Sequence, residues 1–164
     1  MGSRPASKVN MKTYEIHRET RFAQPTVATR ATLAVTEMRE WFPKAFAATY
    51  GQAVSQDATV TGPPYARYHM VGEGRFEVEA GFPVSEPITP VGDVYPGTLP
   101  GGTCAVTSHI GPYDGLAGAY RALEDWISAQ GGTVSADPWE VYYSDPEEEP
   151  ETLRTDVYMP FVTN

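Results

Sequence analysis

A chain of 164 residues with 41% hydrophobic residues is long enough for one domain with a sizeable core, and for two only if each is small. The formal net charge of −9 is uneven: residues 1–84 hold ten Lys or Arg and eight Asp or Glu, whereas residues 85–164 hold two and thirteen. The acidic second half would repel phosphate backbones, which argues against direct nucleic-acid binding and favours a cationic ligand.

The chain carries no signal for a membrane or for secretion. No apolar run approaches the roughly 18 residues that a membrane helix needs, so we predict no membrane association. Residues 1–11 lack the apolar centre of a signal peptide and are interpreted as a flexible leader or a cloning scar. The lone Cys104 excludes an internal disulfide and fits a reducing, cytoplasmic setting. A single cysteine is usually a small buried hydrophobe rather than a catalytic thiol.

Two strands and a helix are predicted first. Residues 14–21 and 26–33 have the branched and aromatic residues typical of strands, and Gln24-Pro25 separates them. Over residues 37–56 the apolar residues recur at spacings near three and four, which predicts a helix that Pro43 interrupts near its start.

A hairpin and a linker come next. Residues 65–71 and 76–84 predict two paired strands around a Gly-Glu-Gly turn. Residues 85–102 contain four prolines and four glycines, which is typical of an extended linker rather than of a regular element.

The second half predicts the same series of elements. Residues 103–109 predict a buried strand, and the apolar stripe after Asp114, the predicted N-cap, indicates a helix that ends at a Gly-Gly pair. Residues 137–143 and 152–161 predict the last two strands, and the acidic run 145–151 between them predicts a solvated loop.

The two halves also repeat one another in sequence. Residues 62–69 match residues 136–143, and residues 78–84 match residues 155–161. Each pair of matching strands follows a helix and an earlier β-rich run, so we predict two copies of one β-α-β-β unit.

One carboxylate lies in the middle of an aromatic strand. Because alternate side chains of a strand face opposite ways, Glu140 shares a face with Tyr142, whereas Trp139 and Val141 take the other. From this pattern alone, a solvated surface residue is the favoured interpretation of Glu140. If it is buried among rings, it should have a raised pKa or bind a cation, since a buried lone charge is costly.

Six segments, in order, resemble the GyrI-like domain family, which includes the effector-binding domains of AraC-type and MerR-type regulators. They are GPPYARYH at 62–69, VEAGFPV at 78–84, LPGG at 99–102, HIGPYDGL at 109–116, PWEVY at 138–142 and DVYMP at 156–160. The resemblance covers residues 12–162 as a single domain, with pseudo-repeats over about residues 12–84 and 99–162.

The resemblance implies an α+β fold in which duplicated β-α-β-β units form a curved antiparallel sheet, with helices on one face and a ligand pocket on the other. It also implies a pocket lined with aromatics around a buried glutamate, which falls on Glu140. Aromatic faces attract cations by roughly 0.5–2 kcal/mol each. We therefore expect the ligand site to consist of Glu140, Tyr142, Tyr68 and Trp41, with Tyr113 and Tyr158 as further candidates from the second repeat.

Other aromatic residues fit the core better. Trp139 is expected to pack beneath the helices, and Phe46, Tyr50 and Tyr120 lie at helical spacings typical of core residues. For Trp41, pocket and core both remain open.

No cofactor or metal site is predicted. The three histidines, at positions 17, 69 and 109, are far apart and lack metal-ligand spacing. Fingerprints of nucleotide-binding loops and of serine hydrolases are absent as well.

These features predict a protein that binds bulky hydrophobic, cationic aromatic small molecules for sensing or sequestration of a drug or toxin, with Glu140 as counter-charge. The alternative, carried by the family resemblance, is a hydrolase that opens cyclopropane-bearing DNA-alkylating compounds by adding water. In that case Glu140 is the general base and Tyr113 or Tyr142 donates a proton.

A lesser alternative is inhibition of DNA gyrase, with the acidic run 145–151 imitating nucleic acid. No DNA-binding motif precedes the domain, so a regulatory role would need a separate protein partner.

Overall fold

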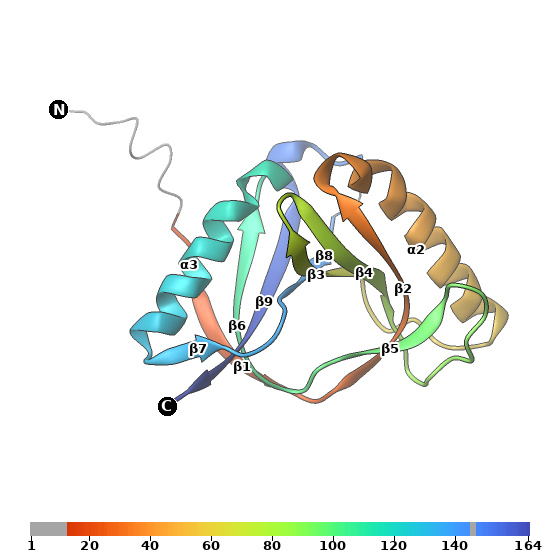
Figure 1. Cartoon of the computed structure of the whole chain (residues 1–164), viewed down its shortest axis with the longest axis horizontal. Helices are drawn as coiled ribbons and strands as arrows, with labels where there is room; N and C mark the ends of the chain where they lie inside the picture. The colour runs from red at the N-terminus through yellow and green to blue at the C-terminus, as the bar shows by residue number, and fades with distance from the viewer. Residues whose placement is uncertain (1–12, 145–146) are drawn as a thin grey trace.

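The computed structural model describes residues 13–144 and 147–164, which form an antiparallel sheet carrying two long helices (Figure 1). The predicted leader and residues 145–146 of the predicted acidic loop lie outside the described residues. The first half contributes β1 (Ile16–Arg21), β2 (Gln24–Ala34), a 3₁₀ turn (Val35–Glu37), α2 (Met38–Ser55), β3 (Tyr65–Gly72) and β4 (Arg75–Pro83). The second half contributes β5 (Tyr95–Leu99), β6 (Gly102–Ile110), a 3₁₀ turn (Tyr113–Gly115), α3 (Leu116–Ala129), β7 (Gly132–Val134), β8 (Trp139–Tyr142), a 3₁₀ turn (Pro150–Thr152) and β9 (Arg154–Thr163).

The sheet has the order β1-β6-β9-β8-β3-β4-β2-β5, with β7 paired to β9. Two copies of a β-α-β-β unit, β2-α2-β3-β4 and β6-α3-β8-β9, therefore meet where β3 pairs with β8, with Ala66 opposite Glu140. Each unit also receives an edge strand from the other half, because β1 pairs with β6 and β5 pairs with β2. The predicted α+β fold built on a curved antiparallel sheet is confirmed.

An apolar stripe holds α3 on the sheet. Its buried residues recur every three or four positions and pack on Ala105 and Val157; they are Leu116, Ala119, Leu123 and Ile127. The helix begins at Leu116 with Gly115 at the N-cap, so the prediction of Asp114 as N-cap is wrong. Within the described part of the chain, no helix is long and apolar enough to cross a bilayer.

The opposite side of the sheet, here called the helix-free face, curls on itself and has a small core of its own. Leu99 of β5 packs in one cluster with Val106 of β6, although these strands lie far apart in the strand order. Trp139 is fully buried in that cluster and stacks on Tyr158, with ring centroids 5.3 Å apart. The prediction that Trp139 packs beneath the helices is therefore wrong, because it is its neighbour Glu140 that faces them.

Strand β5 corrects the prediction that residues 85–102 form an irregular linker. Its Pro96 and Gly97 disfavour a strand in general, but both are tolerated at the edge of a sheet. A Cβ on Gly97 would lie 2.6 Å from the Oγ1 of Thr26, so only glycine lets β5 approach β2 this closely.

Candidate ligand-binding site

Glu140 lies near the middle of the sheet, on the side that carries both helices. Its strand β8 places it opposite Ala66 of β3 and Val157 of β9. Only 6% of the residue is exposed, and its carboxylate accepts a hydrogen bond from Tyr120 of α3. The resemblance had implied a ligand pocket on the face away from the helices. The Glu140 side chain instead lies on the helix side, because it accepts the hydroxyl of Tyr120 from α3.

Three phenol groups surround the Glu140 carboxylate. Tyr120 Oη donates to Oε2 at 2.5 Å, and Tyr142 Oη donates to Oε1 at 2.7 Å. Tyr68 Oη lies 3.5 Å from Oε1 and 2.9 Å from the Tyr142 hydroxyl. Tyr120 of α3 and Tyr142 of β8 belong to the second repeat, and Tyr68 of β3 belongs to the first. Both repeats of the fold therefore hold the carboxylate.

Burial controls the charges of this group. Loss of water raises the pKa of Glu140, while the hydrogen bonds from Tyr120, Tyr142 and Tyr68 act in the opposite direction. Burial and the neighbouring carboxylate in turn raise the pKa of all three tyrosines, which keeps them protonated as donors. In the described residues, no Lys, Arg or His forms an ion pair with Glu140. A buried carboxylate without a counter-ion is left facing the helices.

Aromatic rings extend from this carboxylate across the start of α2. Phe42 contacts the rings of Tyr68 and Tyr142, each with centroids 6.5 Å apart, and stacks on Phe46 at 5.7 Å. The connected rings, here called the aromatic cluster, are Trp41, Phe42, Phe46, Tyr50, Tyr68, Phe76, Phe82, Tyr113 and Tyr142. Many of these side chains keep part of their surface in solvent, so the cluster offers accessible ring faces.

Most of the predicted site residues lie in this arrangement. Tyr142 and Tyr68 reach the carboxylate, Tyr113 contacts the Tyr142 ring with centroids 6.1 Å apart, and Trp41 contacts Phe42 at 5.4 Å. Trp41 thus belongs to the aromatic cluster and also packs on the apolar residues under α2.

Tyr158 does not belong to the site. It lies on the helix-free face, stacked on Trp139, with the Arg21 guanidinium 4.7 Å from its ring centroid. The prediction failed because Tyr158 pairs in register with Trp139, which places both side chains on the face opposite Glu140.

The sequence pattern does not predict the shortest hydrogen bond of the site, which Tyr120 donates to Glu140. The helical spacing of Tyr120 and Phe46 predicts core residues, and no pattern in the sequence indicates that Phe42 and Phe46 contact the ring of Tyr142. The Tyr120 hydroxyl is the one feature that indicates this contact, because a partly buried tyrosine in an apolar stripe needs a hydrogen-bond partner. As for metals, no group of three His, Cys, Asp or Glu in the described residues is close enough to hold an ion.

Comparison with known proteins identifies the family of this chain. A family model, the GyrI-like small molecule binding domain, matches residues 14–162. The chain belongs to the GyrI-like family. No curated protein matches it.

Several solved structures share the GyrI-like fold of this chain. The C-terminal domain of EcmrR has a TM-score of 0.82 and 18% identity, over 93% of this chain and 100% of that one. A hydrolase from Listeria innocua has a TM-score of 0.71 and 14% identity, over 95% and 96%. SAV2435 bound to tetraphenylphosphonium has a TM-score of 0.57 and 15% identity, over 92% and 94%. At these identities the likeness establishes the fold.

Proposed function

We propose that this GyrI-like protein binds a bulky aromatic cation between α2 and α3, with Glu140 as the counter-charge. The observation that carries the proposal is a carboxylate that is 6% exposed, is held by phenols and has no ion-pair partner in the described chain. Burying such a charge without a counter-ion costs free energy, which a bound cation would recover.

The aromatic cluster supports the same ligand class. Ring faces carry negative potential, and each contributes roughly 0.5–2 kcal/mol toward a cation placed over it. Phe42, Phe46 and Tyr142 meet at angles near 65° or stack, so their faces are already oriented by the protein. A related structure, SAV2435, holds tetraphenylphosphonium, which is a cation with aromatic arms.

Access to Glu140 requires movement of a ring. The carboxylate is nearly fully covered, and Tyr142 hydrogen-bonds directly over it. Tyr113 is 46% exposed and contacts Tyr142 from the 3₁₀ turn before α3, so it is the ring that can yield at least cost. We infer that ligand entry displaces Tyr113 and then Tyr142.

A matched pair of ligands tests the proposal. Isothermal titration calorimetry is performed with tetraphenylphosphonium and with neutral triphenylphosphine oxide, on the wild-type protein and on Glu140→Gln. We expect the variant to bind the cation at least about ten-fold more weakly, as for loss of a buried charge partner, and the neutral compound nearly unchanged. Glu124→Gln, which replaces an exposed residue on α3, is the control for the change in net charge. Equal losses for both ligands would remove the counter-charge role.

Hydrolysis of a cyclopropane-bearing alkylating compound is the second candidate function. It is favoured by the chain of hydroxyls from Tyr68 through Tyr142 to Glu140, which places proton donors next to a potential general base. A water would have to replace one phenol at the carboxylate before Glu140 could act as a base. Incubation with such alkylators and mass spectrometry would show a product heavier by one water. If several compounds are bound but returned unchanged, the protein is a binder.

A further inference from the structure

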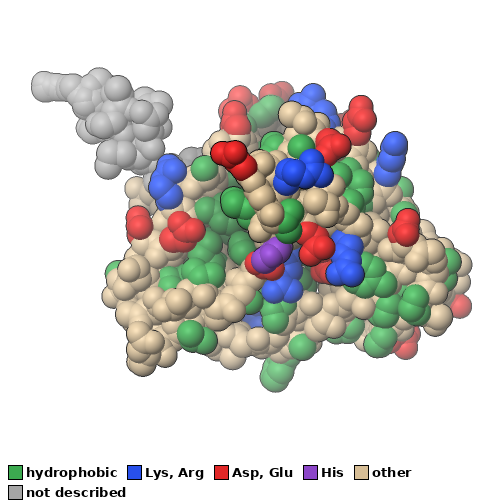
Figure 2. Space-filling model, viewed as in Figure 1, with side chains coloured by type: hydrophobic (Ala, Val, Ile, Leu, Met, Phe, Trp, Pro, Cys, Tyr) green, Lys and Arg blue, Asp and Glu red, His purple; other side chains and the backbone are tan. Residues whose placement is uncertain are grey.

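A second polar site lies on the helix-free face, across the sheet from Glu140. A pocket of about 170 Å³ there is lined by Arg30, Arg67, Tyr68, His69, Glu77, Glu79 and Asp137, from β2, β3, β4 and the segment before β8. Figure 2 shows basic, acidic and histidine side chains close together near the centre of the view, over the strands labelled β3 and β4 in Figure 1.

The arginines of this pocket stand beside a carboxylate without pairing to it. Arg30 of β2 and Arg67 of β3 both lie opposite Glu79 of β4 in the strand register. The Glu79 carboxylate instead accepts the hydroxyl of Tyr65 at 2.8 Å and that of Tyr95 at 2.5 Å. Glu79 is therefore fixed by phenols, and its remaining lone pairs face the pocket.

Each guanidinium is positioned by a ring instead of by an acid. Arg30 Cζ lies 5.5 Å from the Tyr95 ring centroid, and Arg67 Cζ lies 5.9 Å from that of Trp139. Arg67 also donates from Nε to the backbone oxygen of Asp137 at 3.2 Å, which leaves its two terminal nitrogens for another acceptor. Within residues 13–144 and 147–164, neither arginine takes part in an ion pair.

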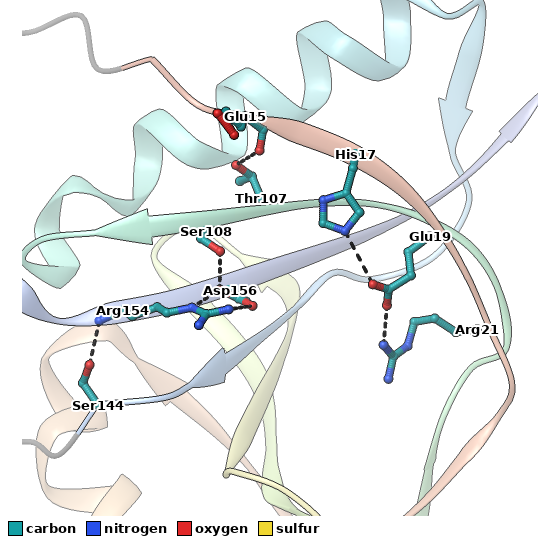
Figure 3. Close-up of polar contacts among 9 residues, drawn as sticks. All are labelled: Glu15, His17, Glu19, Arg21, Thr107, Ser108, Ser144, Arg154 and Asp156. Atoms are coloured by element: carbon teal, nitrogen blue, oxygen red, sulfur yellow. Dashed lines mark hydrogen bonds and ion pairs between the residues drawn. The ribbon is translucent and has the colours of Figure 1, made fainter.

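Elsewhere on the same face, two other arginines do pair with acids (Figure 3). There Arg154 forms a two-pronged pair with Asp156 at 3.0 Å, and Arg21 contacts Glu19 at 2.6 Å, with His17 on the other oxygen of that carboxylate. In these pairs the charges satisfy one another. In the pocket, His69 likewise pairs with Asp137 at 3.0 Å. Arg30, Arg67, Glu77 and Glu79 form no ion pair among the described residues, which leaves both signs available to a ligand.

We propose that this pocket binds a small zwitterion of amino-acid size. The ligand carboxylate takes the free guanidinium nitrogens of Arg30 and Arg67, where bidentate geometry is favourable, and the ligand ammonium group takes Glu77 and Glu79. The two arginines balance the two glutamates, and His69 and Asp137 pair with each other at 3.0 Å, so a ligand that carries both charges satisfies more of the site than a ligand with one charge. The volume is below the roughly 300 Å³ at which pockets for drug-sized ligands begin.

Indole NMR signals provide a local measurement. The chain has three tryptophans: Trp139 is buried beside the Arg67 guanidinium of this pocket, Trp41 lies in the aromatic cluster, and Trp126 packs against Phe161. Titration of ¹⁵N-labelled protein with the standard L-amino acids should shift the Trp139 indole signal in a saturable way and leave the Trp41 signal in place. Acetate and methylammonium, the two halves of a zwitterion, should each bind at least about ten-fold more weakly.

Two variants make the result decisive. Arg67→Gln and Glu77→Gln remove one partner for each ligand charge, and Glu77 is exposed, so that change should leave the fold intact. Both variants should bind the amino acid at least about ten-fold more weakly than the wild type, whereas Glu140→Gln should bind it with unchanged affinity. The proposal is overturned if no amino acid shifts Trp139 at millimolar concentration, if acetate binds as well as the zwitterion, or if Glu77→Gln binds like the wild type. Because Glu140 is not involved, this outcome is independent of aromatic-cation binding.

Discussion

Glu140 and Glu79 are two carboxylates held by tyrosine hydroxyls on opposite faces of one sheet. The phenols come in part from the same strand, because Tyr68 of β3 points to the helices and Tyr65 of β3 points to the helix-free face. Glu140 is nearly fully buried and has no ion-pair partner among the described residues, whereas Glu79 is half-buried between two arginines. The same pair of side-chain types therefore produces a site short of positive charge on one face and a balanced site on the other.

Burial decides how much each phenol matters. A carboxylate shielded from water cannot replace a lost hydrogen bond, whereas one near solvent can take a water molecule instead. The comparison therefore predicts that equal substitutions on the two faces will have unequal effects.

The largest effect is expected from the tryptophans. Trp139 is fully buried and stacked on Tyr158, so Trp139→Ala should lower the free energy of unfolding by about 3–5 kcal/mol. Trp41 is half-buried at the edge of the aromatic cluster, so Trp41→Ala should cost about 1–2 kcal/mol while weakening aromatic-cation binding. Urea unfolding of both variants measures the difference. Similar losses would show that the burial of these two side chains does not set their contributions to stability.

A smaller effect is expected from removing one phenol on each side. Tyr120→Phe leaves the Oε2 of buried Glu140 without its donor and should cost about 1–3 kcal/mol. Tyr95→Phe removes the equivalent donor from half-buried Glu79, where water can replace it, and should cost under about 1 kcal/mol. The two variants can be compared by urea unfolding at one pH. A larger loss for Tyr95→Phe would reverse the ranking of the two carboxylates.

Sequence reasoning reached the fold through the repeated segments, and it reached Glu140 through the resemblance to the GyrI-like family, since the local pattern alone favours a solvated residue there. The repeated segments predict two β-α-β-β units, and strand alternation places Tyr142 beside Glu140. Tyr68 matches Tyr142 in the sequence repeat, and the structure pairs their strands at the seam and brings the two hydroxyls to 2.9 Å.

The remaining site residues depend on information that a single sequence does not contain. Alternation shows which residues of β8 share a face, but not which face the helices will cover. The error at Tyr158 is one of register between β8 and β9, which no local pattern sets. Tyr120 reaches Glu140 only through the orientation of α3 on the sheet.

The smallest expected effect is a difference in how stability varies with pH. Burial raises the pKa of Glu140 in the folded protein, so between its unfolded and folded pKa values the folded state holds the proton more tightly. Wild-type stability should therefore fall as pH rises from about 4 through that window and then level off. Glu140→Gln lacks this titration, so its stability relative to the wild type should rise over the same range. Urea unfolding at a series of pH values measures this, with exposed Glu124→Gln as the control that should run parallel to the wild type. Parallel curves for Glu140→Gln would mean that water reaches the carboxylate freely, and the contrast with Glu79 would then not rest on burial.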